Sequence, residues 1–469
     1  MVGPNFHPPA LAPAVDRYTP APLPGRTAYA GQGDRRGGEA QRFDLGEPVA
    51  ARWWTLFGSP RLNALEDEGL KANTDLASAE AALRQARELY LAQRASLYPT
   101  VELAANAVRA HNSDTIAPPL ANNAQSYGLY TAQLNIAYVP DVFGGVRRQI
   151  EAAAAQTDNQ RFLTQAVYLT LTVNIANTVI QIASLDSQLD EARAAIEADR
   201  RTLAVTERQQ GMGEASTVDV AAARTVLEQA EQLAPPLRKQ IDQQRDMLAT
   251  LLGRPPSLAP SDTPRIGDLS LPLELPVSLP SDLVRQRPDV RAAEANLHAA
   301  SAQVGVATAA RLPSFLLSAA PGGASTQIAT LFSNGNAFWS VTGAVTQTLF
   351  DAGALRHKQK AAEAALEQSR AQYRGVVLAA LQNTADVLQA IVDDAETLRH
   401  ADAAASAAKR SLRLARDAFE HGQSSILPVL NAEAADRQAR ATLFQARGAR
   451  YADTVALFQA LGGGWRDGA

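Results

Sequence analysis

Residues 353–421 read GALRHKQKAAEAALEQSRAQYRGVVLAALQNTADVLQAIVDDAETLRHADAAASAAKRSLRLARDAFEH, without a proline. Apolar side chains recur in this stretch every seven residues, with one four-residue step. The series is Leu366, Tyr373, Ala380, Val387, Ile391, Leu398, Ala405, Leu412 and Phe419. A sustained seven-residue repeat makes helices supercoil left-handedly, and a four-residue insertion locally unwinds the coil. The stretch therefore predicts a helix with one narrow apolar seam, on the order of 100 Å long at ~1.5 Å per residue.

Residues 144–210 form a second proline-free stretch of similar length. Helices of globular proteins average about a dozen residues, so two such stretches argue against an ordinary enzyme domain. The seven-residue pattern alone does not distinguish a long soluble coiled coil from a helical tube attached to a membrane protein.

The composition excludes several classes of protein. The net charge of −4 gives no basic footprint for nucleic acid. Cysteine is absent, which excludes disulfides, thiol catalysis and thiolate metal sites. The chain has no run of 18 or more apolar residues, so we expect no membrane-spanning helix. It opens MVGPNFHPP, which we interpret as a mature start behind an initiator methionine, with no signal peptide.

Matching landmarks indicate an internal duplication of roughly 210 residues. Pro99 and Pro313 are offset by 214 residues, whereas three further pairs are offset by 209. Those pairs are Arg147 with Arg356, Gly213 with Gly422, and Gly253 with Gly462. We therefore predict an extended N-terminal segment (1–59), two repeats (60–273 and 274–462) and a C-terminal tail (463–469). In the N-terminal segment, Trp53, Trp54 and Phe57 are expected to pack against the first helix.

Each repeat is predicted to contain a helix, two strands, a very long helix and a return helix. In the first repeat the ranges are 60–97, 100–111, 127–139, 144–210 and 216–252, followed by a proline-rich connector. In the second they are 281–311, 314–320, 337–349, 353–421 and 425–461. Polar loops are expected between the paired strands, including residues 321–336, and Asp141 is expected to cap the long helix that follows it.

The strand segments alternate apolar and polar residues, as a strand with one apolar face does. Leu134, Ile136, Val341 and Val345 fall on the apolar alternation and are predicted to face lipid. Trp339, Tyr130 and Tyr138 are expected near strand ends, where membrane barrels carry an aromatic girdle. About 11 residues suffice for a tilted strand to cross a bilayer.

Four strands per chain cannot close a barrel, and open edges in lipid would cost several kcal/mol per unpaired group. Two copies would give eight strands, whose bore side chains fill, whereas three copies give twelve strands and leave an opening. The sequence therefore predicts a rotationally symmetric trimer with a 12-stranded β-barrel continuous with a long α-helical barrel, an α+β membrane protein.

Several segments resemble the TolC-like outer-membrane factors, in the lipoprotein branch often called OprM/NodT-like. They are VGPNFHPP, RWWTLFGSPRL, YVPDVFGGVRR, TLFDAGALR and LPSDLVRQRPDVRAAEANLHAASAQVGVATAARLPSF. The resemblance implies a trimeric exit duct in the outer membrane of a Gram-negative bacterium, with a large periplasmic extension and no catalytic residues. It also implies a periplasmic adaptor protein and an inner-membrane pump of the RND, MFS or ABC type as partners. Small molecules such as drugs would pass to the exterior without an enzyme activity, cofactor or metal.

This sequence departs from that branch at two places. Met1 stands where the branch usually has a lipidated cysteine, so the resemblance leaves lipid anchoring open. Pro428 and Asn431 stand where relatives often place aspartates, just after the distal turn of the second repeat. We expect Leu427 to form an apolar constriction there, and cations to block the channel less than in relatives with the aspartates. Asp219 in the first turn could supply a negative charge nearby.

The turns at Gly213–Asp219 and Gly422–Val429 are the candidate periplasmic gate and docking tip. Glycine supplies the positive φ that such a reversal needs, so plain hairpin turns remain an equal alternative. The six histidines show no ligand spacing and are interpreted as solvated. The alternative function is a periplasmic coiled-coil adaptor without a pore, which should lack four strands with an apolar alternate face.

Overall fold

The computed structural model describes residues 1–463 except 10–16, 32–36, 48, 114 and 116–122. The predicted C-terminal tail therefore lies outside the described residues, apart from Gly463. The chain divides into two compact units. One contains residues 1–9, 83–160 and 293–373; the other contains residues 10–82, 161–292 and 374–469.

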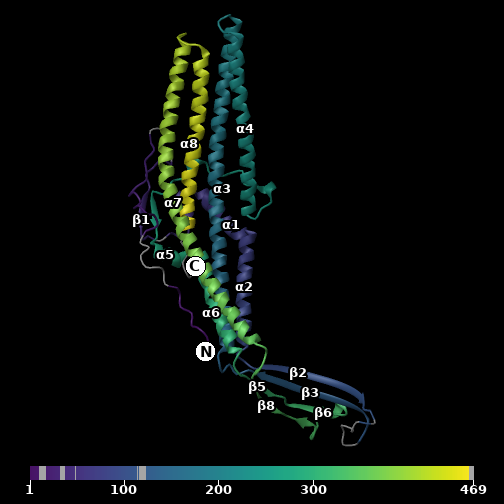
Figure 1. The fold of residues 1–469 in the computed structure, drawn as a ribbon. Helices are drawn as coiled ribbons and strands as arrows, with labels where there is room; N and C mark the ends of the chain where they lie inside the picture. Colours follow the sequence, from purple (N-terminus) through teal and green to yellow (C-terminus); the bar gives the residue numbers. More distant parts are fainter. Residues whose placement is uncertain (10–16, 32–36, 48, 114, 116–122, 464–469) are drawn as a thin grey trace. The chain divides into compact units, whose positions relative to one another are not determined.

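The first unit is built on an antiparallel sheet (Figure 1). Its strands are β2 (Thr100–His111), β3 (Ser126–Tyr138), β5 (Ser314–Ala319), β6 (Gly322–Ser325), β7 (Ala337–Phe338) and β8 (Val341–Thr346). Both β5 and β6 pair with β3, β8 pairs with β5, and β7 pairs with β6. The sheet therefore has four tracks across its width: β2, β3, β5 with β6, and β8 with β7.

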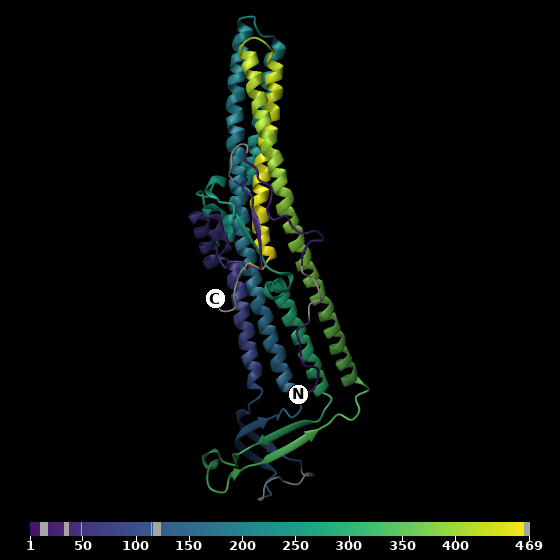
Figure 2. The same ribbon diagram turned by 90° about the vertical axis from the view of Figure 1, so that its left-hand side faces the viewer.

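The second unit is dominated by two helical hairpins whose helices run side by side in both ribbon views (Figures 1 and 2). One hairpin joins α3 (Gly145–Gly211) to α4 (Thr217–Leu251), and the other joins α7 (Ala354–Glu420) to α8 (Ile426–Ala460). The two long helices each have 67 residues and the two return helices each have 35, as the duplication predicts.

The apolar seam predicted for residues 353–421 is buried over most of its length. Leu366, Tyr373, Ala380, Ile391, Leu398, Ala405 and Leu412 are all less than one tenth exposed. At the four-residue step the buried side chain is Leu388 rather than Val387, because the seam shifts by one position where the coil unwinds. Burial of this stripe, rather than helix propensity, supplies most of the stability of such a helix.

The shorter helices correct two predictions. Residues 60–97 form α1 (Pro60–Ala72) and α2 (Thr74–Ala95), separated where the Asn73 side chain accepts hydrogen bonds from the N–H groups of Asp75 and Leu76. Residues 281–311 form α5 (Pro280–Gln286) and α6 (Pro288–Ala309). A proline disfavours helical backbone in the residue before it, so the break falls at Arg287.

The second strand pair also differs from prediction. The expected loop 321–336 begins with β6, which pairs with Tyr130–Gln133 of β3. The expected strand 337–349 is interrupted between β7 and β8 and ends at Thr346. Ala320 and Ser340 nonetheless exchange backbone hydrogen bonds across the interruptions, so the two tracks stay paired.

Two further short strands were not predicted. β1 (Arg42–Leu45) pairs in parallel with β4 (Glu274–Val277), joining the N-terminal segment to the proline-rich connector. Near them, Trp53, Trp54 and Phe57 are fully buried, and Trp53 stacks on Phe458 of α8 at 5.2 Å between ring centroids. The predicted aromatic cluster thus also contacts the end of α8.

Both long helices contain an 18-residue window that is apolar enough to cross a membrane. This was not predicted from the sequence, because neither window is an uninterrupted apolar run. In α3, 61% of that window is buried inside the chain, as in the core helix of a bundle, whereas in α7 the share is 28%. Composition alone therefore does not make these helices membrane spans.

Candidate functional site

The sheet has one apolar face, which the pairing register defines. Val101, Ile136, Ala319 and Val341 lie directly opposite one another on successive tracks. Leu103 opposes Leu134, and Phe315 opposes Val345. Directly opposed residues share a face. All four residues predicted to face lipid therefore lie on one face, together with further apolar side chains.

The other face of the sheet carries most of its polar residues, although Val108 and Leu129 also oppose each other there. Glu102 opposes Asn135, Asn106 opposes Thr131, and Ser318 lies between Ala137 and Thr342. Within β3, the Gln133 amide donates to Asn135 Oδ1 at 2.6 Å. A sheet with one apolar and one hydrogen-bonding face suits a boundary between lipid and water.

The predicted aromatic residues occupy different places along the strands. Tyr138 is the last residue of β3, but Tyr130 is its fifth and Trp339 lies in the interruption between β7 and β8. The expectation that all three lie near strand ends therefore fits Tyr138 and Trp339, whereas Tyr130 lies four residues inside β3. The two tyrosines share a face and lie eight residues apart, about 26 Å at ~3.3 Å per residue. That distance matches the ~25 Å apolar band of membrane barrels, whose borders carry aromatic girdles.

The outer tracks of the sheet are open. Within the described residues, β2 pairs only with β3, and β8 pairs only with β5. Every residue of β8 and all but two of β2 are exposed in the single chain. An exposed strand edge is a template for pairing with another chain.

Aspartates fix the turns that lead from the strands into the long helices. Asp141 accepts hydrogen bonds from the N–H groups of Val146 and Arg147 at 3.0 and 2.9 Å, which confirms the predicted cap. Asp351 accepts from Gly353 and Leu355 at the matching place in the second repeat. Burial acts to raise the pKa of Asp141, but these backbone donors and Arg147 outweigh it and lower the pKa below its usual value.

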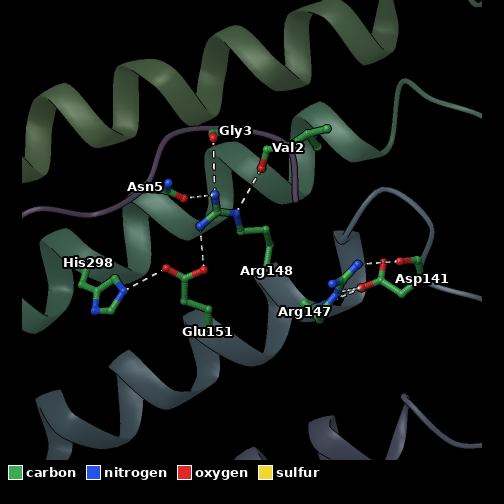
Figure 3. A network of polar contacts seen from close by, with 8 residues as sticks. All are labelled: Val2, Gly3, Asn5, Asp141, Arg147, Arg148, Glu151 and His298. Carbon is green, nitrogen blue, oxygen red and sulfur yellow. Dashed lines mark hydrogen bonds and ion pairs between the residues drawn. The ribbon is translucent and has the colours of Figure 1, made fainter.

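A buried arginine ties the N-terminal segment to α3, as Figure 3 shows. Arg148 donates to the carbonyls of Val2 and Gly3 and to Asn5 Oδ1, and pairs with Glu151 at 2.7 Å. The Glu151 carboxylate also contacts His298 of α6 at 3.0 Å. The interpretation of His298 as a solvated histidine is therefore wrong, because it also stacks on Phe6 at 4.3 Å. Burial acts to raise the pKa of Glu151, but its bonds to Arg148 and His298 lower it overall.

The two distal turns have the same backbone geometry. Gly213 and Gly422 have φ values of +79° and +67°, the left-handed conformation that ends each long helix. Asp219 forms a capping box with Ser216 at the start of α4, and its bonds to the Ser216 hydroxyl and N–H lower its pKa. One oxygen of its carboxylate therefore already accepts hydrogen bonds that stabilise the turn.

Leu427, Pro428 and Asn431 share the exposed side of the first turns of α8. Leu427 is 56% exposed, whereas its neighbours Ile426 and Val429 are buried. Ile426, Val429 and Leu430 pack with Leu412 of α7 and Ala223 of α4. The turn is thus anchored through its buried side, and Leu427 is exposed in the single chain.

Apolar and ionic contacts both hold the four helices together. Within the α3–α4 hairpin the core is apolar, with Leu189 and Ile196 against Leu227 and Ile241. Between α3 and α8 the contacts are ionic: Arg437 pairs with Asp199 at 2.7 Å, and Arg440 pairs with Glu191. The junction between the hairpins is therefore mixed: ion pairs join α3 to α8, and nearer the distal turns Ala223 of α4 packs with Ile426, Val429 and Leu430 of α8.

Comparison with known proteins decides the family. Residues 65–254 and 279–463 match the profile of the family described as outer membrane efflux protein. The chain belongs to this family. It is therefore an outer-membrane efflux channel protein, and the adaptor alternative has no support.

Individual relatives agree with this assignment. The chain is 31% identical to the pyoverdine export outer membrane protein OpmQ of Pseudomonas putida KT2440, over 88% of each chain. It is also 31% identical to the solvent efflux pump outer membrane protein SrpC of Pseudomonas putida, over 95% of this chain and 92% of SrpC. Among solved structures, the outer-membrane channel OprN superposes with a TM-score of 0.87 at 27% identity, covering 99% of each chain.

No three His, Asp or Glu side chains in the described part of the chain are grouped so as to hold a metal ion. Sequence reasoning missed Arg148 and the ionic junction between α3 and α8. Apart from the Arg148–Glu151 pair, the contacts join residues far apart in the sequence, so no local pattern marks them.

Proposed function

We propose that three copies of the chain close a 12-stranded barrel in the outer membrane and a helical tube in the periplasm. This proposal is supported mainly by the four-track sheet, which is apolar on one face and has unpaired outer edges at β2 and β8. Each copy joins its β2 edge to the β8 edge of the next, which satisfies the unpaired backbone groups that lipid would not tolerate. In this arrangement Leu134, Ile136, Val341 and Val345 face lipid, with Tyr130, Tyr138 and Trp339 near its borders.

We propose that small molecules pass passively through the water-filled lumen, past the polar face of the sheet. The distal turns form the periplasmic gate: Leu427 from three copies narrows the tube, beside Pro428 and Asn431. Asp219 adds charge nearby, and Gly213 and Gly422 keep the turns tight. Opening moves one hairpin relative to the other. The ion pairs between α3 and α8 support this, because such contacts can be exchanged with water.

A periplasmic adaptor protein docks at the distal turns, and an inner-membrane pump of the RND, MFS or ABC type supplies the energy. The names of the relatives support a role in efflux systems, since one is described as part of a solvent efflux pump.

Edge pairing is testable with cysteines, because the chain contains none. A double variant, Ala105→Cys on β2 and Gly343→Cys on β8, places one thiol on the apolar face of each outer track. A short bis-maleimide should link neighbours into covalent dimers and trimers, with the series ending at three. Each single variant serves as control and should yield no covalent trimer. A series that continues beyond three, or that stops at two, would contradict the closed trimer.

A further inference from the structure

A cavity of about 400 Å³ lies between the two hairpins of the helical unit. Helices α3 and α8 contribute its charged walls, while Leu233, Pro236 and Leu237 of α4 and Leu412 of α7 contribute apolar ones. Its size is within the range of small-molecule sites, ~300–1,000 Å³.

The charges that line the cavity do not balance. Four acidic side chains line it, from Glu191 and Asp199 on α3 and from Glu433 and Asp436 on α8. Three arginines line it: Arg416 on α7, and Arg437 and Arg440 on α8. No charged side chain of α4 lines the cavity. One negative charge therefore remains when all four carboxylates are ionised.

The ion pairs leave two carboxylate oxygens without a partner. Arg416 pairs with Oε1 of Glu433 at 2.8 Å, and Arg440 pairs with Oδ2 of Asp436 at 2.9 Å. Oε2 of Glu433 and Oδ1 of Asp436 have no hydrogen-bond partner among the described residues. Glu433 and Asp436 are only 3% and 6% exposed. Burying a carboxylate oxygen without a hydrogen-bond partner costs free energy, so a donor that binds these two atoms would be stabilising.

A proton supplies part of that need when the cavity is empty. The pKa of Asp199 is raised to about 7, chiefly by burial. The negative charge of Glu433 and a hydrogen bond between the two carboxyls contribute to this rise, against the opposing effects of Arg437 and Arg416. Asp199 and Glu433 can therefore share a proton near neutral pH, although Oδ1 of Asp436 still lacks a donor.

We propose that this cavity binds one small organic cation, with its ammonium group between Glu433 and Asp436 and its apolar body against Leu233, Pro236 and Leu237. An ammonium group has three donors, which suits two unpartnered oxygens and supplies the missing positive charge. Since both hairpins line the site, an occupied cavity would hold α3 and α8 together.

Calorimetric titration of the detergent-solubilised protein with 2-phenylethylammonium chloride tests the proposal. We expect saturable binding at pH 8, with no more than one ligand per chain. The neutral 2-phenylethanol should bind at least tenfold more weakly. Glu433→Gln and Asp436→Asn should each weaken binding of the cation at least tenfold. The control Glu228→Gln, an exposed carboxylate on α4, should leave it within twofold.

The pH dependence in the unmodified protein is a second readout that no substitution can disturb. The proton shared by Asp199 and Glu433 competes with the cation. Affinity should therefore fall about tenfold from pH 8 to pH 6, the change expected for a group titrating midway between them. No saturable binding at pH 8, equal binding of 2-phenylethanol, or an affinity independent of pH would each overturn the proposal. Since conduction is not measured, a failure here leaves the proposed channel function standing.

Discussion

Replacing Leu134 with arginine tests which face of the sheet meets lipid. Leu134 lies four residues from Tyr130 and four from Tyr138, about 13 Å from each at ~3.3 Å per residue. If the tyrosines mark the two borders of the apolar band, Leu134 sits at the middle of the bilayer. An arginine there should destabilise the inserted protein by about 2–4 kcal/mol per chain. Three copies would lose about 6–12 kcal/mol together, if the sites act independently.

The matched control is Asn135→Arg, one residue further along the same strand. Asn135 lies on the opposite face and is paired across the strands with Glu102, so an arginine there gains an acidic neighbour instead of meeting lipid. The free energy of unfolding would be measured by denaturant titration of protein refolded into phospholipid vesicles. Leu134→Arg should be the less stable variant by at least about 2 kcal/mol per chain. Equal stability of the two variants would refute the face assignment.

Three further predictions concern the helices. Leu427→Ser should raise single-channel conductance in planar bilayers, because a small polar side chain would widen the proposed constriction. Leu414→Ser on α7 is the control. Unchanged conductance of the Leu427→Ser variant would count against Leu427 as the gate. Burial raises the folded pKa of Asp199 above that of the unfolded chain to about 7, so ionisation disfavours the folded state. The contribution of Asp199 to folding stability is therefore fully present at acid pH and is lost as pH rises toward and through 7. Asp199→Asn should reduce the loss of thermal stability between pH 5 and pH 8. An unaltered dependence of thermal stability on pH would be inconsistent with this origin. Arg148→Ala should cost about 2–4 kcal/mol and expose residues 2–5 to amide hydrogen exchange, because a buried charged donor network is lost. The exposed Arg356→Ala is its control, and protection retained at residues 2–5 would exclude the tethering role.

Local periodicity made the helices and strand faces predictable. The seam from Leu366 to Leu412 and the alternation from Tyr130 to Tyr138 each depend on neighbours within the same element. The duplication was visible because helices of equal length repeat the same turns, with Gly213 and Gly422 at matching places.

Pairing between distant segments was not predictable in the same way. β1 and β4 are more than 200 residues apart, and neither segment has a strand period long enough to detect. β6 contains Gly322 and Gly323, which weaken strand propensity, yet β3 supplies the partner that orders them.

The charged contacts show the same limit. Arg148 and Arg437 look like ordinary arginines of amphipathic helices. Arg148 donates to Asn5 in the N-terminal segment and Arg437 pairs with Asp199 of α3, so only the folded chain shows these buried contacts.

The mass of the detergent-solubilised particle, measured by light scattering with the detergent contribution subtracted, tests the central claim most directly. The proposed 12-stranded barrel requires three copies of the 49.8 kDa chain. Our account predicts a protein mass of about three chains at every concentration at which the particle is intact. A particle of one or two chains that still inserts into lipid would contradict it.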